Sequence, residues 1–373
     1  MQEYSDQLGL RCVLMRGGTS KGPFFLEQDL PAPGPRRDAA LLRLMGALEP
    51  RRVDGIGGID SLTNKVAIIS ASNRPDVDVD YLFGQICVHK NTIDYSVNCG
   101  NMLAGVGPFA IDEGLVSATG DATDVAIFNV NTGKRIVATV RTRRGLTVYD
   151  GQDAIDGVAG RAAPVWLKFC EVAGSKTGKL LPTGRAVDVI EGVAVSCVDA
   201  AVPMAIVDAS VFGLTGRESA EEINANPELL AHVERVRCAA GRAMGLGDVA
   251  TLEMPKLVTV SSPRFGGSIS ARYFMPYTCH TSFAVTGAVC LAAAAQIPGT
   301  VAADAATLAA EGKVVIEHPA GRLDVDVEAD HGQAGVEIKS ASLLRTARRL
   351  LAGTVYVPAA TLAAHQFEAA EQS

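Results

Sequence analysis

Short apolar segments alternate with glycine- and proline-containing turns along the whole chain. In the first half they include residues 11–16, 24–26, 65–70 and 125–130, and in the last quarter residues 313–316, 323–327 and 335–338. Short runs of β-branched and apolar residues bounded by turn residues are typical of β-strands. The pattern therefore predicts a chain rich in strands, to which both halves contribute.

Four segments have the spacing or composition of helices. Residues 38–45 predict a short helix with Asp38 as its N-cap, and residues 227–244 predict a charged, periodic helix with Pro227 in its first turn. Residues 100–114 and 283–297 are small and apolar. A helix that is apolar all round is buried, so we expect 283–297 in a core. The internal glycines of 100–114 weaken its helical signal.

A cysteine introduces each of the two apolar helices. The first is preceded by Asn98-Cys99-Gly100-Asn101 and the second by Thr278-Cys279-His280-Thr281. With strands in both halves, this pattern indicates a weak internal repeat. The alternative is coincidence in a chain rich in alanine, glycine and valine.

Composition and charge narrow the classes of function. The 373 residues suggest two or three domains, and 48% hydrophobic residues can form large cores. The net charge of −7 argues against a nucleic acid as the partner. An anionic substrate would need a local positive field that opposes this global charge.

The sequence also bears on compartment and cofactors. The first ten residues resemble no signal peptide, and the longest apolar stretch, 283–297, is too short for a membrane span of about 20 residues. Eight cysteines without a C-x-x-C pair fit reduced thiols in the cytoplasm. The six histidines have no metal-ligand spacing, so we expect neither a metal nor a cofactor.

Two glycine-rich motifs match known signatures only in part. Gly18-Thr19-Ser20-Lys21-Gly22 has the form G-x-S-x-G, but a strand signal follows it where a nucleophile elbow needs a helix. The segment 54–60 approaches G-x-G-x-x-G but ends in Asp60 and lacks a clear preceding strand. Neither hydrolase nor dinucleotide chemistry is expected from them.

The turn around Gly17 and Gly18 is a candidate anion site. Consecutive glycines after a strand allow backbone N–H groups to face one ligand, and Thr19 and Ser20 add hydroxyl donors. The alternative is a tight hairpin that needs a positive φ.

Cys99 is a candidate acid or base. A cysteine at a helix start meets unpaired N–H groups that favour the thiolate, and the amides of Gly100, Asn101 and Met102 could hold a carboxylate. The alternative is a buried structural cysteine, although polar Asn98 and Asn101 argue against a purely apolar setting.

Lys65 opens an apolar strand. It is either a solvated strand end or a desolvated general base, and local spacing alone favours the solvated strand end.

A third group of polar residues lies in the second half. His280, Thr281 and Ser282 precede the second apolar helix, Arg272 lies just upstream, and His318 begins a turn between two strands. Each signal is weak alone, since Ser or Thr at a helix start is ordinarily an N-cap.

Taken together, these motifs resemble the PrpF-type isomerases, relatives of diaminopimelate epimerase. The resemblance is carried by Met15-Arg-Gly-Gly-Thr-Ser-Lys-Gly22, Asp54-Gly-Ile-Gly-Gly-Ile-Asp-Ser-Leu-Thr-Asn-Lys65, Asn98-Cys99-Gly100-Asn101, Leu181-Pro-Thr-Gly184, Cys279-His280 with Thr286-Gly287-Ala288, and His318-Pro319-x-Gly321.

The resemblance implies an α+β, diaminopimelate epimerase-like fold. Two pseudo-symmetric domains, residues 1–183 and 184–373, would each wrap a curled β-sheet around a central α-helix, with the active site between them. The last strand, near residues 354–357, is expected to return to the first domain. A homodimer is the hypothesis for the assembly.

The resemblance also assigns roles to the candidate residues. Lys65 and Cys99 match the acid/base pair, and the expected binding residues for a small polycarboxylate are Gly17, Gly18, Thr19, Ser20, Gly100, Asn101, Met102, Arg272, Cys279, His280, Thr281, Ser282 and His318. The parent epimerases use two cysteines, one per helix start, whereas many PrpF-type proteins lack the second. Whether Cys279 takes part in the chemistry is therefore left open.

Within the family, four further segments resemble the 4-oxalomesaconate tautomerases: residues 29–34, 104–110, 244–248 and 345–348. This implies keto–enol tautomerisation without a cofactor. Oxalomesaconate Δ-isomerases and methylaconitate isomerases stay as alternatives because a 1,3-allylic shift needs the same parts. A carboxylate-binding protein with an inactive site is the alternative that is not an enzyme.

Overall fold

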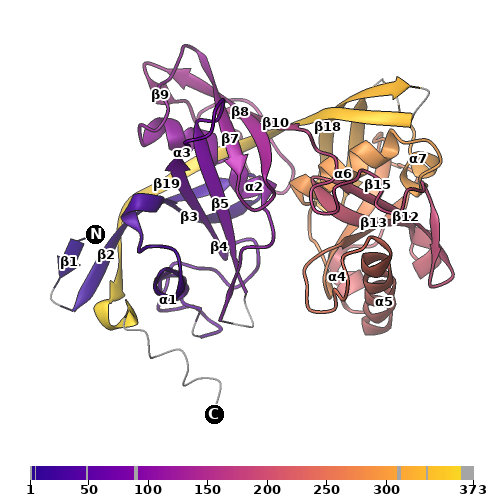
Figure 1. The fold of residues 1–373 in the computed structure, drawn as a ribbon, viewed down its shortest axis with the longest axis horizontal. Coiled ribbons are helices and arrows are strands. Elements are labelled where there is room, and N and C mark those ends of the chain that lie inside the picture. Colours follow the sequence, from indigo (N-terminus) through magenta and orange to yellow (C-terminus); the bar gives the residue numbers. More distant parts are fainter. Residues whose placement is uncertain are drawn as a thin grey trace.

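The computed structural model describes residues 2–4, 6–47, 49–87, 91–308, 312–332 and 335–362. It has two lobes, one built mainly from the first half of the chain and the other from the second, joined by a long strand (Figure 1). Within these residues, no helix has both the length and the apolar character that crossing a membrane requires.

The strands of the first lobe form a closed ring around two short helices. Each strand is hydrogen-bonded to the next, and the last one returns to the first. In ring order they are β2 (Gln7–Gly17), β3 (Ser20–Leu26), β4 (Lys65–Ala71), β5 (Val79–Ile86), β7 (Ala122–Asn129), β8 (Lys134–Arg143), β10 (Pro164–Cys170) and β19 (Gly335–Pro358). Helices α2 (Gly100–Leu103) and α3 (Val106–Asp112) lie inside this ring and share its apolar core.

The second lobe wraps its strands around α6 (Val285–Ala295), all of whose residues are buried. The strands follow the order β12 (Val193–Ala200), β13 (Val202–Asp208), β14 (Lys256–Ser261), β15 (Ile269–Met275), β17 (Lys313–His318), β18 (Gly321–Gly332) and β19. The prediction of a buried helix at 283–297 is confirmed, with each end two residues shorter than predicted.

The two lobes repeat one pattern of strand pairing. From β2 to β8 the pairings are antiparallel, parallel, antiparallel, parallel and antiparallel, and from β12 to β18 the same series recurs. In both lobes the central helices follow the fourth strand of the series. The predicted internal repeat is therefore a repeat of topology, which equates β4 with β14 and α2–α3 with α6.

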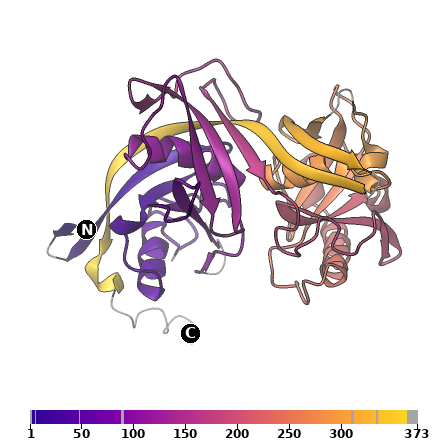
Figure 2. The same ribbon diagram turned by 45° about the horizontal axis from the view of Figure 1, so that its top comes forward.

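The strand β19 belongs to both lobes. It is 24 residues long, pairs first with β18 and β10 and then along its second half with β2. Figure 2 shows it as a yellow band that runs from one lobe over the other. The expected return near residues 354–357 thus takes the form of one continuous strand. The domain boundary at residues 183/184 falls between β10 and β11 (Asp188–Ile190) and stays a prediction.

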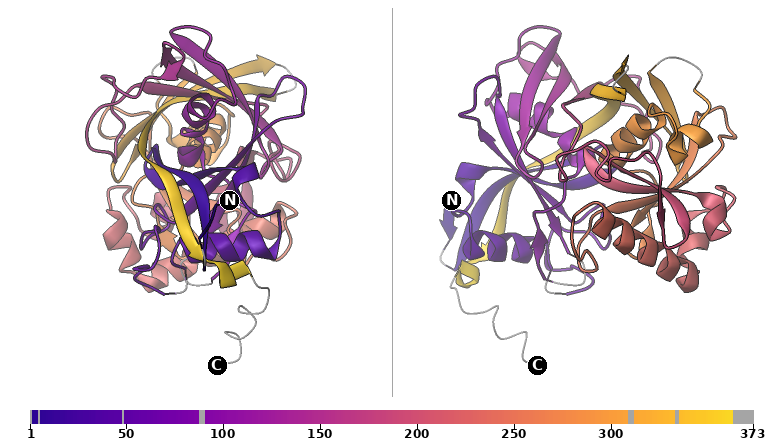
Figure 3. Two further views of the ribbon diagram at one scale, coloured as in Figure 1. Left: turned by 90° about the vertical axis from the view of Figure 1, so that its left-hand side faces the viewer. Right: turned by 45° about the vertical axis from the view of Figure 1, so that its right-hand side comes forward.

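Longer helices cover the outer faces of the lobes. Helix α1 (Pro35–Leu44) packs on the first lobe and α5 (Pro227–Ala243) on the second, each over its own apolar cluster (Figure 3). Helix α5 matches its prediction within one residue, and the Asn226 side chain caps it by accepting from the Leu229 N–H. Asp38 is not the N-cap of α1, which begins three residues earlier behind Gly34, and its carboxylate accepts from the Tyr95 hydroxyl at 2.7 Å instead.

The predicted helix 100–114 is divided into α2 and α3. Glycines in this segment lie where a side chain would collide with the ring. A Cβ on Gly105 would lie 2.6 Å from the Phe24 ring, and one on Gly107 would lie 2.8 Å from Val140. The glycines that weaken the helical signal are therefore the ones that let the segment fit inside the strands.

Shorter elements complete the chain. They are β1 (Gln2–Tyr4), β6 (Ile93–Asp94), β9 (Leu146–Thr147), β11, β16 (Thr278–Cys279), α4 (Ala220–Asn224), α7 (Val301–Ala305), and single 3₁₀ turns at Glu27–Asp29, Ala209–Phe212 and Ala359–Leu362.

Candidate active site

The two central helices begin against each other, where the lobes meet. Gly100 opens α2 and Val285 opens α6, and a Cβ on Gly100 would lie 2.5 Å from the Cβ of Val285. The glycine thus permits the close approach of two helix starts that are 185 positions apart. The candidate residues are best described by their position around this contact.

Cys99 lies at this junction as the N-cap of α2. Its sulfur accepts a hydrogen bond from the Met102 N–H at 3.5 Å and lies 3.9 Å from the Ser20 hydroxyl oxygen. The residue is buried, with 9% exposure, and the hydroxyl of Tyr81 donates to its carbonyl at 3.3 Å. The sulfur therefore has a backbone N–H and a hydroxyl as polar neighbours and does not lie in a purely apolar setting.

Lys65 is the first residue of β4 and is buried, with 6% exposure. Its Nζ donates to Gln85 Oε1 at 2.6 Å and lies 5.3 Å from the centre of the Phe83 ring. Gln85 is itself fixed, since its Nε2 donates to the carbonyls of Ser61 and Asn64. The local reading of Lys65 as a solvated strand end is therefore wrong.

Gly22 of β3 lies between the strand of Lys65 and the helix that Cys99 caps. A Cβ on Gly22 would collide with the Lys65 carbonyl on one side and would lie 3.0 Å from the Met102 methyl on the other. The residues at alternate positions after Lys65, Ala67 and Ile69, belong to the same apolar cluster as Cys99 and Met102. Strand alternation therefore directs the Lys65 side chain to the inner face of the ring, which α2 also occupies.

The glycine turn is a hairpin that packs on α2. Gly17 pairs with Ser20, and Gly18 has the positive φ of 51° that the hairpin alternative requires. The Gly18 N–H donates to the Thr346 carbonyl at 2.9 Å, and the Thr19 N–H donates to Asn101 Oδ1 at 3.4 Å. These two amides are thus engaged within the protein, and the expected backbone anion site is not formed by them. The hydroxyls of Thr19 and Ser20 are the donors that this turn offers.

Two buried histidines of the second lobe face the junction. Burial is the main cause that lowers the pKa of His280 to about 4, and the charges of Lys65 and His318 act in the same direction. Burial is also the main cause that lowers the pKa of His318 to about 4, and the charge of Arg345 adds to it. Both rings are therefore neutral near pH 7.

The tautomer of each ring follows from its hydrogen bond. Nδ1 of His280 accepts from the Ser282 N–H at 2.9 Å, and Nδ1 of His318 accepts from the Ala320 N–H at 3.2 Å. A neutral imidazole whose Nδ1 accepts carries its proton on Nε2. Each histidine thus presents an uncharged N–H donor.

A loop from the first lobe brings several candidates together. A Cβ on Gly157 would lie 3.2 Å from the Thr19 methyl group, 3.7 Å from the Ser282 hydroxyl oxygen and 3.8 Å from Ala320. Next to it, Asp156 Oδ2 accepts from the Arg322 N–H at 2.5 Å. Three segments therefore lie against the loop at Gly157: the turn with Thr19, the segment with Ser282 before α6, and the turn with Ala320 after His318.

Arg272 and Cys279 lie elsewhere. The Arg272 guanidinium donates to the carbonyls of Glu218 and Ala271, at 2.7 and 3.0 Å. Cys279 belongs to the apolar cluster under α5, and burial raises the pKa of its thiol to about 12. Helix α6 begins six residues after Cys279, behind the N-cap Ala284. The expectation that Cys279 and residues 280–282 form the start of the second helix is therefore wrong, because a loop separates them from it.

Three residues at this junction carried no signal in the sequence: Gln85 beside Lys65, and Asp156 and Gly157 in the loop. Arg345 belongs to the segment 345–348 that indicated the subgroup, but it was not predicted as a site residue. It is buried, and its Nε finds no partner among the described residues. Burial lowers the pKa of Arg345 to about 10. Thr281, by contrast, is exposed. No group of acidic, histidine or cysteine side chains in the described part of the chain is arranged to hold a metal ion.

Comparison with known proteins identifies the family of the chain. The family model described as PrpF protein matches residues 7–358. A protein of Pseudomonas putida named 4-oxalomesaconate tautomerase is 48% identical over 94% of this chain and 97% of its own length. A protein of Novosphingobium named (4E)-oxalomesaconate Delta-isomerase is 49% identical over 93% of this chain and 97% of its own length.

Solved structures extend the likeness to the fold. A crystal structure of methylitaconate-delta-isomerase superposes with a TM-score of 0.80 at 39% identity, covering 96% of this chain and 98% of that one. A hydroxyproline epimerase from Agrobacterium vitis, at 11% identity and a TM-score of 0.57 over 96% of this chain and 94% of its own, shares the fold alone. The chain therefore belongs to the PrpF family, and it is an isomerase with the diaminopimelate epimerase-like fold.

Proposed function

We propose that this isomerase tautomerises 4-oxalomesaconate by proton transfer without a cofactor. Lys65 serves as the base and Cys99 as the acid or proton relay. The observation that carries the proposal is that Lys65 is buried on the inner face of the ring that encloses α2, and that the N-cap of α2 is the buried Cys99, next to the contact between the two helix starts. The names of the relatives from Pseudomonas putida and Novosphingobium support the substrate.

The chemistry follows from the substrate class. A carbonyl conjugated to a C=C bond makes the allylic C–H acidic, and its removal yields a dienolate. Return of a proton elsewhere on the conjugated system completes the isomerisation. The reaction needs a base, an acid on the proper face and donors for the developing negative charge, and no redox step.

The described residues supply such donors. The hydroxyls of Thr19 and Ser20 come from the first lobe, and the Nε2–H groups of His280 and His318 come from the second. Because both imidazoles are neutral, they stabilise an oxyanion by donating hydrogen bonds without offering a proton that is easily lost. The loop at Asp156 and Gly157 lies against Thr19 and against Ser282 and Ala320, whose N–H groups hold the two imidazoles, so it can exclude water from the substrate.

Turnover in D₂O tests the proposal. Freshly generated 4-oxalomesaconate is mixed with the enzyme, and the reaction is followed by ultraviolet absorbance and proton NMR. We expect conversion between keto and enol forms with deuterium incorporated at the allylic carbon. Binding that stabilises the protein thermally without any solvent exchange would instead support the inactive binding protein.

The same spectra separate the competing isomerisations. A 1,3-allylic shift moves the C=C bond and leaves a different set of vinyl signals from those of keto–enol exchange. The Novosphingobium relative, named as a Delta-isomerase, makes this the second candidate. Methylaconitate is tested in the same way, and turnover of it alone would contradict the proposed substrate.

Compartment and assembly belong to the same proposal. The cytoplasm is the proposed compartment, since the eight cysteines of the sequence include no C-x-x-C pair and fit reduced thiols. A homodimer stays a prediction, which light scattering of the purified chain would test.

A further inference from the structure

The internal repeat gives Lys65 a counterpart in the second lobe. Lys65 opens β4, which pairs in parallel with β3 and antiparallel with β5. Lys256 opens β14, which pairs in parallel with β13 and antiparallel with β15. The two lysines therefore occupy equivalent positions in the repeat, although the sequences around them show no shared motif.

The equivalence extends to the direction of the side chains. Two residues after Lys65, Ala67 belongs to the apolar cluster that surrounds the central helices, and two residues after Lys256, Val258 belongs to the same cluster. Residues two apart on a strand face the same side. The Lys256 side chain thus points to the inner face of the second lobe, as the Lys65 side chain does in the first lobe. Both lysines lie at the start of their strands.

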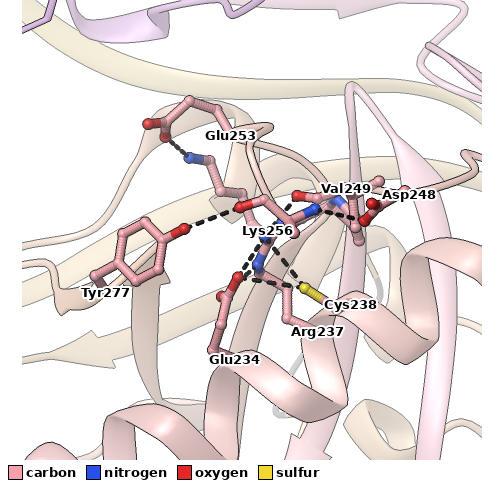
Figure 4. Close-up of polar contacts among 10 residues, drawn as sticks. Glu234, Arg237, Cys238, Asp248, Val249, Glu253, Lys256 and Tyr277 are labelled. Atoms are coloured by element: carbon pink, nitrogen blue, oxygen red, sulfur yellow. Dashed lines mark hydrogen bonds and ion pairs between the residues drawn. The ribbon is translucent and has the colours of Figure 1, made fainter. Parts of the chain in front are cut away.

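Lys256 is buried but keeps a carboxylate partner. It is 7% exposed, and its Nζ donates to Glu253 Oε2 at 2.7 Å, as Figure 4 shows. Glu253 is 39% exposed at its side chain and so reaches solvent. Burial lowers the pKa of Lys256, while Glu253 acts in the opposite direction. An ammonium group has three N–H donors, so it can bind a second carboxylate beside Glu253.

The two lysines act on the same region. The charge of Lys65 contributes to lowering the pKa of Lys256, and both lysines contribute to lowering that of His280. Two ammonium groups, one from each lobe, therefore lie within electrostatic range of the buried His280. In a chain with a net charge of −7, such a local concentration of positive charge attracts an anionic ligand against the global field.

We propose that Lys256 is a second substrate-binding cation, which holds a carboxylate of the substrate at the end remote from Lys65. Two lysines at the site, Lys65 and Lys256, would favour substrates with three carboxylates over those with two. The inference rests on the proposed function for the substrate class only, because binding can be measured without turnover. The polar contact between Lys256 and Glu253 shows the kind of bond that a substrate carboxylate would make.

The test is calorimetric binding of a non-reacting probe, propane-1,2,3-tricarboxylate. We expect Lys256→Met to weaken its binding by at least about tenfold, since a buried charge-assisted hydrogen bond is lost. Lys256→Arg, which keeps the charge, should restore binding to within about threefold. Lys313→Met is the matched control, because Lys313 also opens a strand but is half exposed, and it should bind as the unmodified protein does.

Further variants separate binding from folding. Lys256→Met leaves Glu253 without its partner, so the double variant Glu253→Gln/Lys256→Met is measured alongside, with thermal unfolding of each. Should neither fold, Glu253→Gln decides: removal of the competing carboxylate should tighten probe binding, and unchanged or weaker binding would overturn the proposal.

The outcomes also distinguish this inference from the proposed function. If Lys256→Met folds and binds the tricarboxylate as tightly as the unmodified protein, Lys256 is not a binding cation. If the unmodified protein binds the probe in a Lys256-dependent way but turns over no unsaturated tricarboxylate, the proposed reaction fails and the binding role stands.

Discussion

At the scale of single residues, Lys65 and Cys99 derive their properties from their partners. Gln85 and Phe83 hold the Lys65 ammonium in a buried position, and the first turn of α2 holds the Cys99 sulfur. Neither set of contacts could be predicted from Lys65 or Cys99 alone. The consequences can be tested by substitution.

Lys65→Ala should abolish most of the turnover. Loss of a positioned base typically costs a factor of about 10² to 10⁴ in rate. We expect kcat to fall by that amount while the protein remains folded, as judged by circular dichroism. Lys313→Ala, at another strand start, is the control and should keep full activity. Full turnover by the Lys65 variant would exclude it as the base.

Cys99→Ser should reduce kcat by about 10² or more, because a hydroxyl is a much weaker acid than a thiol and scarcely ionises near pH 7. Cys279→Ser should leave kcat within about threefold, since Cys279 packs in the outer apolar cluster. Steady-state assays of the two variants side by side make the comparison. A large loss from Cys279→Ser with no loss of stability would place Cys279 in the chemistry.

The buried histidines predict how stability depends on pH. The folded state holds the pKa of His280 and His318 at about 4, whereas the unfolded chain has ordinary values near 6.5. Between these values the unfolded state binds more protons, so the free energy of unfolding should fall as pH drops below about 6.5 and level off below about 4. Urea unfolding at pH 7.5 and 5 measures the change.

The control for that dependence is a substitution. His280→Gln should reduce the change in the free energy of unfolding between pH 7.5 and 5 by on the order of 2 kcal/mol. The exposed His331→Gln should leave that change unaltered. An unchanged dependence in His280→Gln would mean that His280 is not held neutral.

At the scale of elements, glycines decide where the helices lie. The break between α2 and α3 and the contact between α2 and α6 both occur where a Cβ would collide with a neighbour. The helix starts can therefore meet only because one of them begins with glycine.

Gly100→Ala should destabilise the protein and lower its activity. The added methyl group would overlap Val285, and forced overpacking typically costs about 1 to 3 kcal/mol. Val285→Ala in the same chain should recover part of that loss, which a double-mutant cycle of unfolding free energies would measure. Gly353→Ala, whose nearest neighbour would lie 3.9 Å away, is the control. Equal effects of the two alanines would argue against the close approach.

At the scale of the whole molecule, two lobes with one topology are joined by a shared strand and a bridging loop. β19 pairs with strands of both lobes, and the loop at Asp156 crosses from the first lobe to the turn after His318. The site therefore lies where the repeats face each other, and Lys65 and Lys256 approach it from equivalent positions.

Asp156→Ala should weaken substrate binding more than it weakens the fold. It removes the bond to the Arg322 N–H that holds the loop against the second lobe. We expect KM to rise by about three- to tenfold, with the free energy of unfolding changed by less than about 0.5 kcal/mol. Asp150→Ala, an exposed residue near the same loop, serves as the control. An unchanged KM would mean that the loop does not help to hold the substrate.

Local sequence patterns predicted several elements and the position of Cys99 at a helix start. The periodicity and Pro227 predict α5 within one residue, because helical spacing and the first-turn preference of proline are local. Cys99 at a polar helix start is also a local feature, and the structure places it as the N-cap. The motif resemblance added the family and the fold.

Tertiary structure decided which side chains meet. Lys65 is buried only because β4 lies between β3 and β5 in a closed ring, and Cys279 turns away because its strand packs against α4, where Asn224 bonds the Cys279 backbone. A shift of one position on a strand moves a side chain to the opposite face, and strand pairing between distant segments fixes that choice. Lys256 and Asp156 join the site for the same reason: the pairing of the two lobes positions them, and no local pattern marks them.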